Sequence, residues 1–146
     1  MVNGIFYPEG EAALTNLLIS WGLKKGLPVQ GGQTIVVPHG AWDLTGSIAA
    51  SAFAGVQKNG GDSDIGRVLL LGTCHQSNED GIYLSESDFF ETPLGDLEVD
   101  QSLNRKLSSC STLICINDIH IFPNIPLRFN FPWLSFVFPT HRLSRY

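Results

Sequence analysis

The fold prediction starts from two stretches of sequence: Thr34-Ile35-Val36-Val37-Pro38-His39-Gly40 and Val68-Leu69-Leu70-Leu71-Gly72-Thr73-Cys74-His75. Each contains a short apolar run that is typical of a buried β-strand, and each places a histidine just past the end of that run. Ligands of open α/β sheets bind in the crevice beyond the carboxyl ends of the strands. We therefore expect His39 and His75 to converge on one metal ion or substrate.

The chain between the two stretches predicts a helix. Asp43 or Thr45 can cap its start, and Asn59-Gly60-Gly61 ends it. Its predicted apolar face consists of Ile48, Ala52, Phe53 and Val56. With strands predicted over residues 33–38 and 66–72, this is a βαβ unit. Its crossover sets the two strands parallel, so that both histidines emerge at the same edge of the sheet.

The rest of the chain predicts further α and β elements. An amphipathic helix is expected from Glu9 to Lys25, with Leu14, Leu17, Leu18 and Trp21 on its apolar face. Short strands are expected over residues 81–84 and 88–90, then a Pro-Leu-Gly turn, a helix over 99–107 and a strand over 113–116. The expected fold class is α/β, with a mixed or mostly parallel sheet and flanking helices.

Composition restricts the class of protein. The chain of 146 residues suffices for one domain, and its net charge of −5, without a cluster of Lys and Arg, argues against nucleic acid and anionic membranes as partners. It has no apolar run near the ~20 residues that span a bilayer and no basic leader before an apolar core, so a cytoplasmic protein is expected. The three cysteines, Cys74, Cys110 and Cys115, form no Cys-x-x-Cys pair and are expected to be reduced thiols.

The composition changes abruptly after Asp118. All 14 acidic residues lie at or before that position, whereas residues 120–146 hold five of nine Phe, four of eight Pro and three Arg, with no Asp, Glu or Lys. Prolines at 123, 126, 132 and 139 predict that this segment forms no helix. Its Phe-Pro-Trp-Leu-Ser-Phe-Val-Phe run would expose a large apolar patch if it did not pack.

Four separated motifs, in order over residues 1–119, resemble the Memo family. They are Gly4-Ile5-Phe6-Tyr7-Pro8; Pro38-His39-Gly40-Ala41-Trp42 with Gly46; Leu71-Gly72-Thr73-Cys74-His75; and Thr92-Pro93-Leu94-Gly95-Asp96-Leu97 with Val99-Asp100. The resemblance implies a fold related to the class III non-haem iron extradiol dioxygenases, with a metal or substrate pocket at one edge of an α/β core. Family members are much longer, so this chain is expected to be a truncated, N-terminal half of the domain.

Past Asp118 the family would continue with a Glu-His-Ser-x-Glu-x-x-Leu-Pro stretch, which the sequence lacks. Back-translation of residues 120–132, read from the third base of the His120 codon, gives His-Phe-Ser-Glu-His-Ser-Ile-Glu-Val-Gln-Leu-Pro. One base lost near Ile119 would account for this. The hypothesis is therefore that residues 1–119 form the Memo-like part and that 120–146 are an out-of-frame tail.

The resemblance implies that His39 and His75 are metal ligands. Without it, a loop histidine that bonds to a backbone carbonyl is the more usual role. The family's Pro-His-Ala-Gly-Tyr motif has Trp42 in place of tyrosine, and its Gly-Pro-Ser-His-His motif has Gln76 in place of the second histidine. Trp42, Gln76, Cys74 and Phe6 are predicted to line the pocket, although packing is the ordinary role for Trp42 and Phe6. Cys74 is adjacent to a candidate ligand, but we favour a packed thiol.

Two imidazoles do not complete a site for iron, zinc or copper, each of which needs at least a third protein ligand. The family draws that ligand from its C-terminal half. Asp43, four residues after His39, is explained equally well by helix capping, and Glu79 and Asp80 are typical of a solvated turn.

Two classes of function remain. In the first, the protein is metal-binding and redox-active or dioxygenase-like, with iron or copper as the candidate cofactor, and any enzyme activity is that of a non-haem metal-dependent oxidoreductase. In the second, it is a non-catalytic scaffold that binds a small molecule or a peptide, since a fold does not establish a function. For these 146 residues alone, an unpaired sheet edge and an uncovered apolar face predict association or poor solubility.

Overall fold

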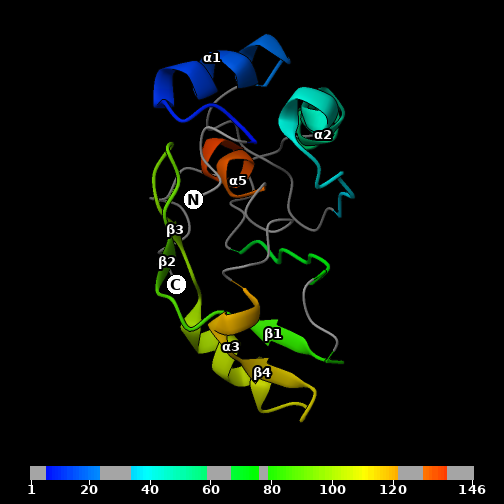
Figure 1. Cartoon of the computed structure of the whole chain (residues 1–146), viewed down its shortest axis with the longest axis vertical. Coiled ribbons are helices and arrows are strands. Elements are labelled where there is room, and N and C mark those ends of the chain that lie inside the picture. The colour runs from blue at the N-terminus through cyan, green and yellow to red at the C-terminus, as the bar shows by residue number, and fades with distance from the viewer. Residues whose placement is uncertain (1–5, 24–33, 59–66, 76–78, 122–129, 138–146) are drawn as a thin grey trace.

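A computed structural model describes residues 6–23, 34–58, 67–75, 79–121 and 130–137, with only the backbone of 56–58 and of residue 120. Its elements are the helices α1 (Glu11–Ser20), α2 (Trp42–Lys58), α3 (Gln101–Ser108) and α5 (Phe131–Val137), the strands β1 (Ile82–Leu84), β2 (Phe89–Phe90), β3 (Leu97–Glu98) and β4 (Ile114–Ile116), and the 3₁₀ turn η1 (Asp118–His120). The predicted α/β class is confirmed, as Figure 1 shows.

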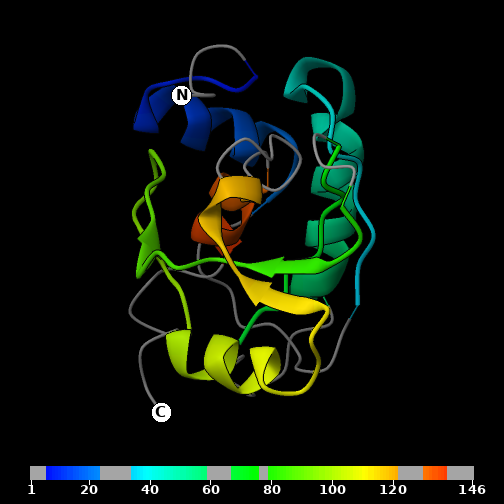
Figure 2. The ribbon, with the colours of Figure 1, turned by 60° about the horizontal axis from the view of Figure 1, so that its bottom comes forward.

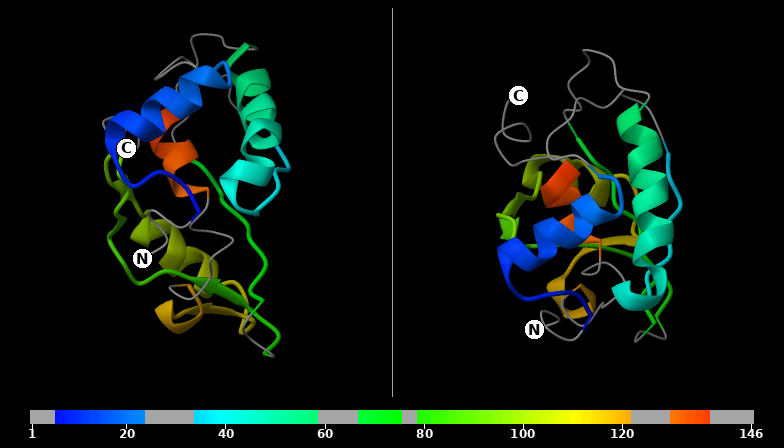
Figure 3. Two further views of the ribbon diagram at one scale, coloured as in Figure 1. Left: turned by 45° about the horizontal axis from the view of Figure 1, so that its top comes forward. Right: turned by 90° about the horizontal axis from the view of Figure 1, so that it is seen from above.

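The core lies among helices α1, α2 and α5 rather than against a sheet. In Figures 1 and 3, α5 lies between α1 and α2. Aromatic rings fill this centre: the Trp133 ring centroid is 4.3 Å from that of Trp42, 5.5 Å from Phe53 and 5.7 Å from Trp21. The buried residues of the core are Tyr7, Leu14, Leu18, Leu23, Trp42, Ala49, Ala50, Phe53, Trp133, Phe136 and Val137. Hydrophobic burial therefore joins three helices that are distant in sequence.

The two predicted N-terminal helices are confirmed, with changed details. Helix α1 buries Leu14 and Leu18 as its periodicity predicts. The prediction that Asp43 or Thr45 caps the next helix is wrong, because α2 already begins at Trp42 and the Thr45 hydroxyl donates back to the carbonyls of residues 40 and 41. The buried face of α2 includes Phe53, as predicted, but Ile48 is exposed. The side chain of Val56 lies outside the described residues.

The predicted strands over 33–38 and 66–72 are not strands where the structure describes them, from 34 and from 67 onward. Val36 is exposed by 92%, Leu69 by 70% and Leu71 by 77%, whereas Ile35 and Val37 are partly buried and pack against the core. Parallel strands are stable where both faces are covered, and such exposure shows that these segments lack that cover. The two apolar segments therefore do not form the predicted βαβ unit.

Two small sheets form farther along the chain. Strands β1 and β4 pair in parallel, with Tyr83 opposite Cys115, and β2 pairs antiparallel to β3, with Phe89 opposite Glu98. Figure 2 shows β1 and β4 side by side. The strands predicted over 81–84, 88–90 and 113–116 are thus confirmed, as is the helix predicted over 99–107, which corresponds to α3. In the turn between β2 and β3, Gly95 has φ +113°, a conformation that favours glycine.

The prediction that prolines forbid a helix in the C-terminal segment is wrong. Pro132 is the second residue of α5, where its missing N–H would have no helical partner in any case. Residues 133–137 contain no proline, so the helix continues. The Ser135 hydroxyl donates to the carbonyl of Gly95 at 3.2 Å and bonds to the Thr92 hydroxyl at 3.0 Å. These contacts join α5 to the β2–β3 turn.

The longest helix in the described part of the chain, α2, has 17 residues, and none there has the length and apolar character needed to cross a membrane.

Candidate functional site

The two histidines that follow the apolar segments meet in space. The Nε2 atoms of His39 and His75 are 3.2 Å apart, although 36 residues separate them in sequence. Their ring centroids are 5.2 Å apart and both side chains are exposed. The predicted convergence is therefore present, although the segments that carry the histidines are not strands. At this distance the two ring nitrogens form a hydrogen bond, in which the tautomers decide which ring donates.

The first turn of α2 fixes the loop that carries His39. The Thr45 hydroxyl donates to the carbonyl oxygens of Gly40 at 3.0 Å and of Ala41 at 3.1 Å. A Cβ on Gly40 would lie 2.9 Å from the Thr45 methyl carbon, so glycine permits this close approach. The amide of Trp42 donates to the carbonyl of Phe6 at 3.0 Å, which ties the loop to the N-terminal segment. The loop directly after His39 is therefore held by Thr45 and by the N-terminal segment at Phe6.

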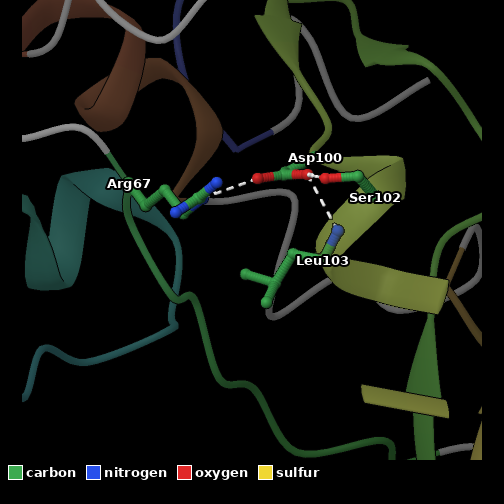
Figure 4. A network of polar contacts seen from close by, with 4 residues as sticks. All are labelled: Arg67, Asp100, Ser102 and Leu103. Atoms are coloured by element: carbon green, nitrogen blue, oxygen red, sulfur yellow. Dashed lines mark hydrogen bonds and ion pairs between the residues drawn. The ribbon is translucent and has the colours of Figure 1, made fainter. Parts of the chain in front are cut away.

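An ion pair anchors the segment that leads to His75. The Nε of Arg67 donates to Oδ2 of Asp100 at 2.6 Å, and Asp100 is also the N-cap of α3 (Figure 4). The other carboxylate oxygen, Oδ1, accepts from the Ser102 hydroxyl at 2.7 Å and from the Leu103 amide at 2.9 Å. These hydrogen bonds from Ser102, Arg67 and Leu103 hold the pKa of Asp100 far below its usual range. Asp100 thus links α3 to the segment that carries His75.

We expect Asp100→Ala to lower the free energy of unfolding by about 1 kcal/mol at pH 7, mainly through loss of the helix cap. The ion pair adds little, because the side chains of Arg67 and Asp100 are 58% and 33% exposed. Since the pKa of Asp100 is lowered by folding, its charge stabilises the protein above the unfolded value near ~4 and loses that effect as the pH falls below it. Urea unfolding at several pH values should show that the difference in free energy of unfolding between the variant and the unmodified chain becomes smaller at acid pH.

The matched control is Asp100→Asn, which keeps an oxygen acceptor for the cap without the charge. Asp100→Asn should lose less free energy of unfolding than Asp100→Ala does. The pH dependence of its stability should lack the contribution of the Asp100 carboxyl. A gap between the alanine variant and the unmodified chain that widens below pH 4 would contradict the assignment.

The remaining predicted site residues fall in different places. Trp42 is buried in the aromatic core, with its ring centroid 5.3 Å from that of Tyr7, and the partly buried Phe6 packs against the same core. Cys74 directly precedes His75 and is half-buried as a thiol. Gln76 lies outside the described residues. Of this predicted set, the structure brings His39 and His75 together, and it places Trp42 in the aromatic core.

Carboxylates do not complete the histidine pair in the described part of the chain. No group of three His, Cys, Asp or Glu side chains is placed there to hold a metal ion. Asp43 is exposed in the first turn of α2, and Glu79 and Asp80 are exposed ahead of β1. Within these ranges the pair therefore supplies two donors.

Sequence reasoning missed the part played by Asp118. Its Oδ1 accepts from the Ser85 hydroxyl at 2.6 Å and from the Glu86 amide at 3.1 Å, and its Oδ2 accepts from the Ser87 hydroxyl at 2.9 Å. These contacts tie the segment after β4 to the segment after β1. The signal was available, because Asp118 follows a predicted strand just as the two histidines follow apolar runs. We assign Asp118 a structural role, since its contacts satisfy backbone and hydroxyl groups.

Comparison with known proteins defines the class. The family model described as Memo-like protein matches residues 1–142. The chain belongs to the Memo-like family.

Curated relatives come from eukaryotes and archaea. The chain is 30% identical over 104 residues to the "Protein memo-1 homolog" of Caenorhabditis elegans, covering 71% of this chain and 29% of the relative. It is 32% identical over 120 residues to a MEMO1 family protein of Pyrobaculum aerophilum, covering 74% and 40%. With a MEMO1 family protein of Desulfurococcus amylolyticus the identity is 24% over 149 residues, covering 94% and 51%. The chain thus spans about half or less of the length of these relatives.

Proposed function

We propose that this chain carries part of a transition-metal site, with His39 and His75 as two ligands of iron or copper. The observation that carries the proposal is the 3.2 Å separation of the two Nε2 atoms, which come from segments 36 residues apart. In tetrahedral zinc sites, two imidazole nitrogens, each at roughly 2.0–2.1 Å from the ion, are about 3.3 Å apart. The observed separation is close to this value, which supports two donors to one metal ion.

Such a site suits redox or oxygen chemistry better than a purely structural role. Iron or copper held by two imidazoles keeps positions open for a substrate or oxygen, and supplies the redox step that side chains lack. In this chain, the Thr45 contacts hold the loop directly after His39, and the Arg67–Asp100 ion pair holds the start of the segment that leads to His75. Hydrogen bonds around a ligand are a recognised determinant of metal affinity. A dioxygenase-like activity of the complete protein is part of this proposal.

The test is metal binding by the purified chain and by the variants His39→Ala, His75→Ala and the double variant. We expect Fe²⁺ under anaerobic conditions, or Cu²⁺, to bind, and each single substitution to weaken binding at least tenfold, the lower end of what even an outer-shell change costs. Equilibrium dialysis followed by elemental analysis measures the bound metal. The control His141→Ala removes the same side chain from outside the described residues and should leave binding unchanged.

The second candidate is a non-catalytic protein that binds a peptide or a small molecule. The exposure of Val36, Leu69 and Leu71, large apolar side chains on the segments that lead to the two histidines, supports it, because exposed apolar surface can take part in binding. Metal uptake that is absent, or that is unchanged in the double histidine variant, would exclude the metal site and leave this candidate. Circular dichroism of each variant must match that of the unmodified chain for the comparison to count.

We also propose that residues 120–146 are encoded out of frame. The loss of every acidic residue after Asp118 and the family motif recovered one base away support this. The matched region of the family model extends into this segment, so the nucleotide sequence around the Ile119 codon is the direct test. An intact natural frame through Tyr146 would exclude the proposal.

A further inference from the structure

A glycine directly follows His39 and separates it from the first turn of α2. Glycine restricts its own backbone less than any other residue, so Gly40 by itself would allow the histidine many orientations relative to the helix. Gly40 does not have the positive φ that usually explains a glycine, in contrast to Gly22 and Gly95. The reason for a glycine at this position therefore lies in the atoms around it.

The side chain of Thr45 occupies the space beside Gly40. A Cβ on Gly40 would lie 2.9 Å from the Cγ2 methyl carbon of Thr45 and 3.6 Å from its Oγ1. The hydroxyl donates to the carbonyl oxygens of Gly40 and Ala41 at 3.0 and 3.1 Å. The Ala41 carbonyl also accepts from the backbone amides of Leu44 and Thr45, at 3.0 Å each. The contact that the hydroxyl adds to this helical turn is therefore the one to Gly40.

We propose that Thr45 is a positioning residue for His39. Its hydroxyl fixes the carbonyl of Gly40, and thereby the backbone next to the imidazole, so that the Nε2 atom of His39 lies against that of His75. The inference rests on the proposed function in one respect, namely that the paired imidazoles bind a metal ion. Removing a group that orients a metal ligand from behind typically weakens metal binding by roughly 10–100-fold.

The branched side chain of threonine gives the proposal a specific consequence. The methyl group and the hydroxyl are attached to the same Cβ, so neither can move without the other, and χ1 of a β-branched residue is restricted. A methyl group added in Gly40→Ala pushes on Cγ2 and should therefore turn the hydroxyl away from the carbonyls. Thr45→Ser removes Cγ2, so that the same alanine would meet the remaining hydroxyl oxygen at an ordinary contact distance.

The experiment compares Thr45→Val, Thr45→Ser, Gly40→Ala and the Gly40→Ala, Thr45→Ser double variant, each in the full chain. Equilibrium dialysis measures the dissociation constant for Cu²⁺. In the metal-free chain, NMR measures the nuclear Overhauser effect between the ring protons of His39 and His75. We expect Thr45→Val and Gly40→Ala each to weaken Cu²⁺ binding about tenfold or more and to weaken the Overhauser effect. Thr45→Ser should bind Cu²⁺ more tightly than Thr45→Val.

Two comparisons separate positioning from a general effect on the fold. The double variant should bind Cu²⁺ more tightly than Gly40→Ala alone, which a chain that merely unfolds would not do. Ser51→Ala is the matched control, because the Ser51 hydroxyl donates to the Ser47 carbonyl at 2.9 Å, six residues farther along α2. It removes a hydroxyl contact of the same kind and should leave both measurements unchanged.

The two measurements can fail independently. Unchanged Cu²⁺ binding and an unchanged Overhauser effect in Thr45→Val would overturn the role of Thr45 and leave the proposed function standing. A loss in Gly40→Ala that Thr45→Ser does not relieve would also overturn it, because a clash with the methyl group would then not be the cause. An Overhauser effect that changes as expected in a chain that binds neither Cu²⁺ nor Fe²⁺ would support the positioning of His39 by Thr45 and overturn the proposed function.

Discussion

Trp133→Ala is expected to lower the free energy of unfolding by about 3–5 kcal/mol, the range for deleting a large core aromatic. Trp133 is 1% exposed and lies within 6 Å, ring to ring, of Trp42, Phe53 and Trp21. Its removal leaves a cavity at the point where three helices meet. Small domains have a free energy of unfolding of only about 5–15 kcal/mol, so this substitution removes a large part of it. Urea unfolding followed by circular dichroism measures the loss without relying on tryptophan fluorescence.

Trp133→Phe is the matched control, because it keeps an aromatic ring that can contact Trp42 and Phe53. Its loss should be less than half that of the alanine variant. Identical unfolding curves for Trp133→Ala and the unmodified chain would show that α5 is not in the core. The prediction is compatible with an out-of-frame origin of residues 120–146. The hydrophobic effect favours burial of an apolar helix against an apolar face, and it does not depend on how the helix came to be encoded.

Gly46→Ala is expected to destabilise the chain by about 1–3 kcal/mol, although alanine is the better helix former. A Cβ at Gly46 would overlap the indole of Trp21, with Cζ3 only 2.6 Å and Cζ2 3.1 Å away. The ring has little room to move, because it also stacks on Trp133 at a centroid distance of 5.7 Å. The added methyl group must therefore displace part of the aromatic core.

Gly55→Ala makes the same chemical change in the same helix and should have the opposite effect. A Cβ at Gly55 meets nothing within 4 Å, so the variant should gain about 0.5–1 kcal/mol from reduced backbone freedom in the unfolded chain. Thermal or urea unfolding of the two variants in parallel gives the comparison. Two changes of the same sign would mean that Trp21 does not pack on Gly46.

The sequence predicted the local elements well and their assembly less well. Helix α1, α3 and the strands near 82, 89 and 114 follow from periodicity and turn residues, which act over a few neighbours. The apolar runs before His39 and His75 predict buried strands, but burial depends on which other elements cover them, and that is a tertiary property. Helix α5 was missed because proline was counted without regard to its position in the first turn.

For the candidate site, the proximity of the two histidines is present, but the reason given for it is not. The sequence predicts that His39 and His75 meet at the edge of a parallel sheet, and their Nε2 atoms lie 3.2 Å apart although the segments that carry them form no strands where the structure describes them. The anchors were not predicted, since the Arg67–Asp100 pair spans 33 residues and no periodic pattern connects the two. The Asp118 contacts to Ser85 and Ser87 span more than 30 residues and were invisible for the same reason. Motifs can indicate candidate site residues, whereas the residues that anchor their segments are seen only in the fold.

The place of α5 has a consequence for biosynthesis. Trp42 emerges from the ribosome 91 residues before Trp133, the ring that covers it. At a synthesis rate of about 5–20 residues per second, that interval lasts roughly 5–18 s. During that time the indoles of Trp21 and Trp42 lack their contact with Trp133. The nascent chain therefore exposes more of these two indoles to water until residue 133 has been made.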